Sequence, residues 1–218
     1  MSLEEELEGF KAGFRANAPA DVQAQMAAAT EALASSGILD RALKSGEQLP
    51  EFTLPNQLGK QTSSSDLLAE GPMILTFYRG GWCPYCNLEL RAYQAYLGRI
   101  NGAGASLVAI TPELPDESLN TVAKNELEFH VLTDQDGVYA EKLGLLFTVP
   151  EDIREIYTGF GIDLEQHNGE GKFILPLPAT YVVNSDGLVC EAFVDADYTK
   201  RMEPEEAIAA LESINVAA

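Results

Sequence analysis

The sequence predicts an α/β fold in which a central mixed β-sheet is flanked by helices. Residues 73–77 (MILTF) are continuously apolar, which is typical of a strand buried on both faces of a sheet. A helical pattern and a second apolar run at 106–110 (SLVAI) follow, and this order predicts two parallel strands joined by a helix. Residues 179–184 and 188–194 flank an Asp-Gly turn, which predicts an antiparallel hairpin. The sheet should therefore contain both kinds of strand pair.

An N-terminal helical extension is expected over residues 1–44, ahead of a single domain over residues 45–218. Apolar side chains recur at helical spacing between Leu3 and Phe14 and form one stripe. Asp21 can cap a second, Ala-rich helix. Because the extension contains neither cysteine nor histidine, we expect it to serve packing or dimerisation rather than catalysis.

Periodicity and capping signals predict the remaining elements in chain order. They are strands at 50–55 and 129–132 and helices at 64–68, from 84 to the Asn-Gly pair at 101–102, at 116–126, 138–143 and 150–157, and from 204 onward. Residues 145–161 are interpreted as an insertion before the last hairpin. The chain shows no internal repeat, linker or low-complexity segment that would divide the domain.

Composition narrows the classes of partner. The chain has 218 residues, with 34 acidic against 14 basic, which gives a net charge of -20. Such a surface repels phosphate backbones and anionic lipid head groups, so neither nucleic acid nor membrane is an expected partner. Residues 1–10 lack the order of a secretory signal, and no apolar run is long enough to span a bilayer. The odd count of 3 cysteines does not suggest a secreted disulfide scaffold, and a cytoplasmic location is expected.

The chemistry centres on a CxxC motif, Cys83 and Cys86, placed where the first buried strand turns into a helix. Residues three apart share one helix face, so the two sulfurs can meet in a disulfide. Free N–H groups and the dipole of a first helical turn favour a thiolate, and Pro84 suits the first helical position. Lowering a thiol pKa from about 8.5 to about 6 makes it roughly 90% ionised at neutral pH. Arg79 is the candidate cation for that shift.

Several segments resemble the thioredoxin fold and, within it, the peroxiredoxin family of alkyl hydroperoxide reductase C and thiol-specific antioxidant. The resemblance covers about residues 45 to 214. It is carried by residues 82–86 (WCPYC), 177–181 (LPATY), 46–54 (GEQLPEFTL), 133–137 (TDQDG) and 197–204 (DYTKRMEP). The first and last of these, with residues 78–81 (YRGG), are similar to one peroxiredoxin-like branch in particular. The second resembles the segment where this fold places a cis-proline, here Pro178, beside the cysteines.

The resemblance implies a thiol-dependent peroxidase that reduces hydrogen peroxide or organic hydroperoxides through a dithiol and disulfide cycle. It implies an external dithiol reductant such as thioredoxin or glutaredoxin, and neither an organic cofactor nor a metal ion. The expected catalytic pair is Cys83 and Cys86. Active-site support is expected from Arg79, Trp82, Pro84, Tyr85, Pro178 and Arg201.

Two positions depart from the peroxiredoxin pattern. Typical peroxiredoxins carry a Thr three residues before the peroxidatic cysteine, and here Cys83 stands at that position, so the resemblance makes Cys86 the peroxidatic residue. Exposure at a helix start instead favours Cys83 as the first attacker. Typical peroxiredoxins also bind the peroxide with an Arg just before the late strand, and here Pro178 stands at that position. Arg79 or Arg201 would have to replace that arginine. The order of attack therefore stays open at this point, with Cys86 favoured for a peroxide and Cys83 for a disulfide substrate.

Other readings of the same residues are a thiol–disulfide oxidoreductase, acting on protein or glutathione disulfides, and a non-catalytic interaction module. A zinc site is disfavoured because it needs two more ligands. Cys190 is expected to be a buried, inert thiol, and His130 and His167 are expected to be incidental. Tyr85 is expected to be exposed, and Trp82 to be a lid or a packed ring. The default for Arg201, with Asp195 and Asp197, is a surface ion pair.

Overall fold

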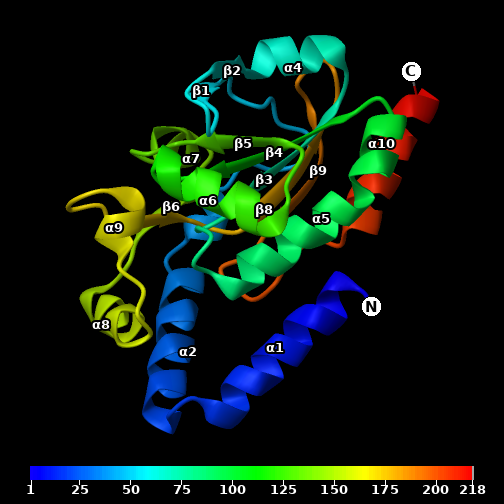
Figure 1. The fold of residues 1–218 in the computed structure, drawn as a ribbon. Helices are drawn as coiled ribbons and strands as arrows, with labels where there is room; N and C mark the ends of the chain where they lie inside the picture. The colour runs from blue at the N-terminus through cyan, green and yellow to red at the C-terminus, as the bar shows by residue number, and fades with distance from the viewer. Residues whose placement is uncertain (218) are drawn as a thin grey trace.

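A five-stranded mixed sheet forms the centre of the computed structural model, in the order β5-β4-β3-β8-β9 (Figure 1). The central strand β3 (Met73–Phe77) pairs parallel with β4 (Ser106–Thr111) and antiparallel with β8 (Ala179–Val183). β5 (His130–Thr133) joins β4 in parallel, and β9 (Val189–Val194) joins β8 in antiparallel. The predicted mixed sheet is confirmed. The structure describes residues 1–217, and their side chains as far as residue 214.

Helices cover both faces of this sheet, which explains why β3 is apolar at every position. Ile74 points into one core with α5 and α10, and Leu75 points into the other with α4 and α7, because successive side chains of a strand alternate. The first face carries α5 (Pro84–Gly102), α6 (Pro115–Asn125) and α10 (Pro204–Ala217), and the second carries α3 (Ile38–Arg41), α4 (Ser64–Glu70) and α7 (Val138–Lys142). In the described part of the chain, no helix is both long and apolar enough to cross a membrane.

Smaller elements complete the domain. They are the antiparallel pair β1 (Thr53–Pro55) and β2 (Gln61–Ser63), the pair β6 (Leu146–Thr148) and β7 (Ile174–Pro176), and the helices α8 (Glu151–Gly159) and α9 (Leu164–Asn168). The sequence pattern predicted α8 but not β2, β6, β7 or α9. The strands β6 and β7 are three residues each and lie far apart in the chain, so each becomes a strand only through its partner.

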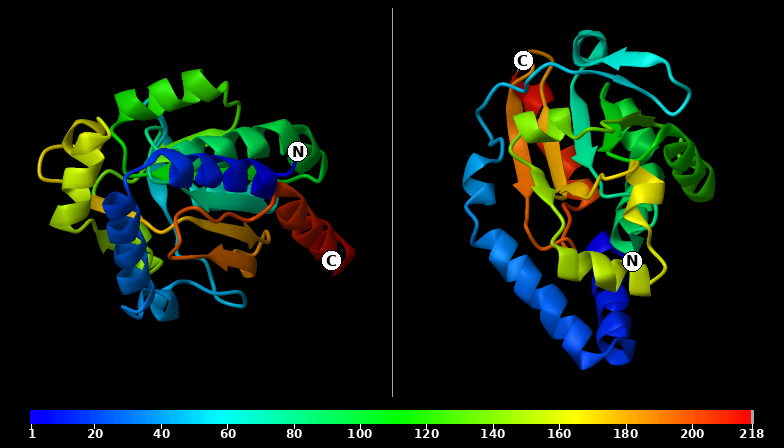
Figure 2. Two further views of the ribbon diagram at one scale, coloured as in Figure 1. Left: turned by 90° about the horizontal axis from the view of Figure 1, so that it is seen from below. Right: turned by 90° about the vertical axis from the view of Figure 1, so that its left-hand side faces the viewer.

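The N-terminal helices α1 (Leu3–Asn17) and α2 (Ala20–Ala34) form a hairpin that packs against the domain (Figures 1 and 2). α1 lies along α5, and α2 lies against α8. Two backbone N–H groups of the first turn of α1, at Leu3 and Glu4, donate to the Glu203 carboxylate at 3.2 and 2.6 Å. Asp21 does not cap α2, because the helix begins one residue earlier, with Pro19 at its N-cap.

Candidate dithiol active site

Cys83 and Cys86 lie at the start of α5, directly after β3 and its loop. Cys83 is the N-cap residue and Pro84 is the first helical residue, as the sequence predicted. Both thiols are free and nearly inaccessible, with Cys83 at 1% and Cys86 at 0% exposure. The expectation of an exposed Cys83 was therefore wrong. Side chains from the N-terminal hairpin and from the loop after β9 cover the helix start.

Tyr85, between the cysteines, is part of this cover and is only 5% exposed, which contradicts the prediction that it is exposed. The ring of Phe10, on α1, meets it edge-on with 5.1 Å between ring centroids. The ring of Tyr198 meets it from the loop after β9 at 5.6 Å. Trp82 is a packed and only partly exposed ring, 5.5 Å from the ring of Tyr157. Aromatic packing thus closes the dithiol off from solvent.

Arg79 reaches the dithiol from the loop after β3. Its Nη1 lies 4.0 Å from Cys83 Sγ, and its backbone N–H donates to Cys86 Sγ at 3.5 Å. The guanidinium lies over the rings of Tyr198 and Trp82, at 4.6 and 4.9 Å from their centroids, and it donates from Nη2 to the Tyr157 hydroxyl. Within the described residues, no carboxylate forms an ion pair with Arg79. This buried cation is held by aromatic faces and faces a thiol.

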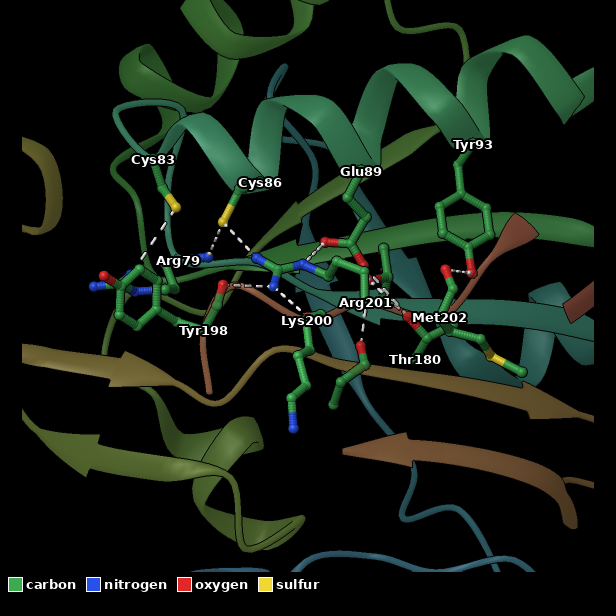
Figure 3. A network of polar contacts seen from close by, with 12 residues as sticks. Arg79, Cys83, Cys86, Glu89, Tyr93, Thr180, Tyr198, Lys200, Arg201 and Met202 are labelled. Carbon is green, nitrogen blue, oxygen red and sulfur yellow. Dashed lines mark hydrogen bonds and ion pairs between the residues drawn. The ribbon is translucent and has the colours of Figure 1, made fainter. Parts of the chain in front are cut away.

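Arg201 approaches the other sulfur, with Nη2 3.2 Å from Cys86 Sγ (Figure 3). Its Nε lies 2.5 Å from Glu89 Oε2, and its Nη1 donates to two backbone carbonyls, of Tyr198 and Lys200, at 2.7 and 2.6 Å. Both side chains of the ion pair are fully buried. The expected surface ion pair of Arg201 is therefore wrong. Lys200 takes that place with Asp195, because the loop after β9 folds Arg201 back toward α5.

The surroundings of the two sulfurs shift the pKa values of the two thiols in opposite directions. Burial by itself raises the pKa of a thiol, because it disfavours the charged form. At Cys83 the hydrogen bond from Cys86 and the charges of Arg79 and Arg201 outweigh burial and lower the pKa to about 6. Burial, with the hydrogen bond to Cys83 and its negative charge, raises the pKa of Cys86 well above its usual value. Cys83 therefore holds the thiolate, and Cys86 holds the proton.

Glu89 is a site residue that the sequence analysis missed. Burial raises the pKa of its carboxyl to about 7, although the Arg201 charge favours the ionised form. Its Oε1 accepts a hydrogen bond from Thr76 Oγ1 at 3.1 Å. The signal that could have found it is its spacing, because Glu89 follows Cys86 by three residues and so shares its helix face.

A second buried carboxylate, Glu113, anchors the loop before the cysteines. Its Oε1 accepts from the Gly81 backbone N–H at 2.8 Å, and its Oε2 accepts from Thr121 Oγ1 at 3.3 Å. Asn87 Nδ2 donates to the Gly81 carbonyl at 2.7 Å from within α5. A side chain at Gly81 has no room, because a Cβ there would lie 1.9 Å from Thr121 Oγ1. These contacts hold the loop that carries Arg79 and Trp82.

One group of side chains in the described structure has the composition of a metal site. Glu113, Glu117 and His167 offer three ligand atoms within 4.8 Å of one another. His167 Nδ1 lies 2.9 Å from the Glu117 carboxylate and 3.7 Å from that of Glu113. The group includes neither cysteine, and Glu113 already accepts the two hydrogen bonds that anchor the loop. His130 is exposed at the start of β5 and contributes nothing to the dithiol.

Two further expectations are corrected. Pro178 was expected to follow a cis peptide bond, but its peptide bond is trans, and the described residues contain no cis peptide bond. The trans form is the intrinsically favoured one, and only the resemblance had suggested otherwise. Cys190 is partly exposed rather than buried, because its strand β9 is the edge of the sheet.

Comparison with known proteins shows which family the sequence matches. Residues 45–192 match the AhpC/TSA family. The chain is 26% identical to peroxiredoxin Bcp of Escherichia coli strain K12 over 103 residues, which are 47% of this chain and 65% of that protein, less than two thirds of its length. It is 27% identical to the chloroplastic peroxiredoxin Q of Triticum aestivum over 191 residues, 88% of this chain and 75% of that protein.

A crystal structure with a similar fold covers most of this chain. The crystal structure of peroxidoxin BcpB from Mycobacterium tuberculosis matches it with a TM-score of 0.63 and 22% identity. The match covers 79% of this chain and 98% of that one. At this identity the likeness concerns the fold alone, and it agrees with the thioredoxin-like architecture that the sequence predicted.

Proposed function

The chain belongs to the AhpC/TSA family, and from that premise we propose that it is a thiol-dependent peroxidase that reduces hydrogen peroxide or organic hydroperoxides. The observation that carries the proposal is the pairing of a low-pKa thiol, Cys83, with a protonated neighbour, Cys86, between two buried arginines. The relatives named peroxiredoxin support the same activity.

In the first step the Cys83 thiolate attacks one peroxide oxygen and the O–O bond breaks. The sulfur loses two electrons and becomes a sulfenic acid, and the other oxygen leaves as an alkoxide or hydroxide that takes up a proton. Arg79, whose Nη1 lies 4.0 Å from the Cys83 sulfur, would stabilise the negative charge that develops on the leaving oxygen. It would fill the role of the family arginine, whose position in this chain is occupied by Pro178.

In the second step the Cys86 sulfur attacks the sulfenic sulfur, a disulfide forms and water leaves. An external dithiol, such as thioredoxin or glutaredoxin, then returns two electrons by thiol–disulfide exchange. Because both sulfurs are buried in the reduced protein, the start of α5 has to open after oxidation for this exchange. No organic cofactor or metal ion enters either step.

Our assignment of Cys83 as first attacker rests on its charge environment, whereas the family position corresponds to Cys86. The alternative, a thiol–disulfide oxidoreductase, uses the same pair but needs a disulfide to reach a sulfur that is 1% exposed. A peroxide group is smaller than a protein or glutathione disulfide, so it needs a smaller opening to reach the same sulfur. A non-catalytic interaction module would predict normal function without either cysteine.

The test is a stopped-flow measurement of reduced protein mixed with hydrogen peroxide, followed by fluorescence of Trp82, the only tryptophan. Wild type should react far faster than a free thiol. The Cys86→Ser variant should keep the fast phase, and Cys83→Ser should lose it. The reverse pattern would move the peroxidatic role to Cys86, and free-thiol rates in all three proteins would contradict the peroxidase.

We further propose that the chain divides into an extension over residues 1–44 and a domain over residues 45–218, which the start of the family match at residue 45 supports. A cytoplasmic location would keep the dithiol reduced. The packing of α1 along α5 supports a packing role for the extension, and dimerisation stays a prediction.

A further inference from the structure

A cavity of about 260 Å³ lies between α2, α8 and the side chain of Arg79. Its walls come from five segments of the chain and are mostly apolar. They include Met26, Ala29 and Leu33 of α2, Val149 and Ile153 at α8, and Pro178 before β8. A cavity of about 150 Å³ with such walls stays dry and binds benzene, so this one has room for a larger apolar group.

The single charged residue among those that line the cavity is Arg79. It is 3% exposed, and its Nε is buried without a hydrogen-bond partner. Its Nη1 lies 4.0 Å from Cys83 Sγ. An unpaired buried donor is costly, which points to a ligand that supplies an acceptor. The cavity therefore suits a molecule with an apolar body and one polar end directed at Arg79.

We propose that this cavity holds the apolar body of an organic hydroperoxide, and that α2 is the element that selects it. This inference rests on the proposed peroxidase function. The peroxide group would accept a hydrogen bond from Arg79, whose Nη1 lies 4.0 Å from Cys83 Sγ, while the hydrocarbon part contacts α2 and α8. Because α2 lies outside the matched residues 45–192, the preference would come from a segment added to the family domain.

Size and charge specify the class of substrate. Apolar walls favour an uncharged aryl or branched alkyl group, as in cumene hydroperoxide, and hydrogen peroxide would leave most of the space unfilled. Transfer of one oxygen to Cys83 converts cumene hydroperoxide to 2-phenyl-2-propanol. This alcohol keeps the same apolar body and lacks the O–O bond, so it is an unreactive probe of the cavity.

The test fills the cavity from α2. Ala29→Phe places a ring in the cavity, and Ala28→Phe places the same ring on the exposed side of the helix, where residue 28 lines no cavity. We expect kcat/KM for cumene hydroperoxide to fall about tenfold or more in Ala29→Phe, with hydrogen peroxide changed by less than about twofold. Ala28→Phe should leave both values unchanged. Ala29→Leu fills less of the cavity and should lower kcat/KM for cumene hydroperoxide by an intermediate amount. This variant provides the test if Ala29→Phe does not fold.

Calorimetric titration of the reduced protein with 2-phenyl-2-propanol supplies a readout that needs no turnover. Binding in wild type and Ala28→Phe, with loss in Ala29→Phe, supports the inference. Turnover of hydrogen peroxide without alcohol binding, or equal loss of both peroxides in the Ala29 variants, overturns the inference and leaves the peroxidase standing. A protein that binds the alcohol but reduces no peroxide overturns the proposed function, and the substrate assignment falls with it.

Discussion

Two buried arginines flank the dithiol, and their surroundings differ. Arg201 has a carboxylate partner, Glu89, at 2.5 Å and two backbone carbonyls, so most of its donors are satisfied inside the protein. Arg79 is surrounded by aromatic rings, has no carboxylate and leaves Nε unpaired beside the apolar cavity.

These surroundings indicate that one arginine serves structure and the other serves chemistry. A paired cation is a fixed anchor, because its charge is largely neutralised by its partner. An unpaired cation keeps its field for a thiolate or a ligand. Arg201 should therefore hold the loop after β9 on Cys86, and Arg79 should act on Cys83 and its substrate.

The largest effect is expected on the anchored side. Glu89→Ala leaves Arg201 buried without its counter-charge, which should lower the free energy of unfolding by about 3–5 kcal/mol. Urea unfolding at pH 8, above the raised pKa of Glu89 of about 7, measures this value with the carboxylate ionised. Glu206→Ala, an exposed glutamate of α10, is the control and should cost less than about 1 kcal/mol. Equal effects of the two changes would show that the buried pair is not an anchor.

On the unpaired side, activity rather than stability should change. Arg79→Met keeps the apolar contacts but removes the charge near Cys83, so the rate of Cys83 oxidation should fall by about 100-fold. Stopped-flow oxidation by hydrogen peroxide gives this rate, with the exposed Arg99→Met as control. A stability loss as large as that of Glu89→Ala, with the rate unchanged, would exchange the roles of the two arginines.

The pH dependence of thiol reactivity tests whether Arg79 acts on Cys83. Since the pKa of Cys83 is lowered to about 6, its reactive thiolate is present above that pH and is lost as the pH falls through it. Alkylation by iodoacetamide should therefore fall about tenfold per pH unit below about pH 6. Arg79→Met should move the midpoint upward. A Cys190→Ser background removes the partly exposed third thiol from the measurement. A midpoint that stays in place in Arg79→Met would remove Arg79 as a cause of the shift.

The smallest effect concerns the cover supplied by the N-terminal hairpin. Phe10→Ala removes an edge-on aromatic contact with Tyr85, which should cost about 1 kcal/mol and speed alkylation of the thiols. Urea unfolding measures the stability, and the rate of alkylation by iodoacetamide measures the access to the thiols. The exposed Leu58→Ala, which lies away from the dithiol, should leave the alkylation rate unchanged. An unchanged rate in Phe10→Ala as well would mean that the hairpin does not limit access.

The sequence alone was enough to predict the parallel strand–helix–strand unit that carries the dithiol and the antiparallel hairpin of β8 and β9. Each of these depends on residues that are neighbours in the chain. The buried run at β3, the helix start at Pro84 and the Asp-Gly turn before β9 are local patterns, and local hydrogen bonding and periodicity suffice to specify them. The family resemblance rests on the same kind of local motif.

The tertiary structure alone decided which groups surround the sulfurs. Arg201 and Cys86 are 115 residues apart, and their contact exists because the loop after β9 packs on α5. The covering of Tyr85 by Phe10 and the pairing of β6 with β7 likewise join segments that are distant in the chain. The low pKa of Cys83 depends in part on the charge of Arg201, a residue distant in the chain, which acts against the opposing effect of burial. A linear pattern does not contain them, because they arise only when helices and loops pack together.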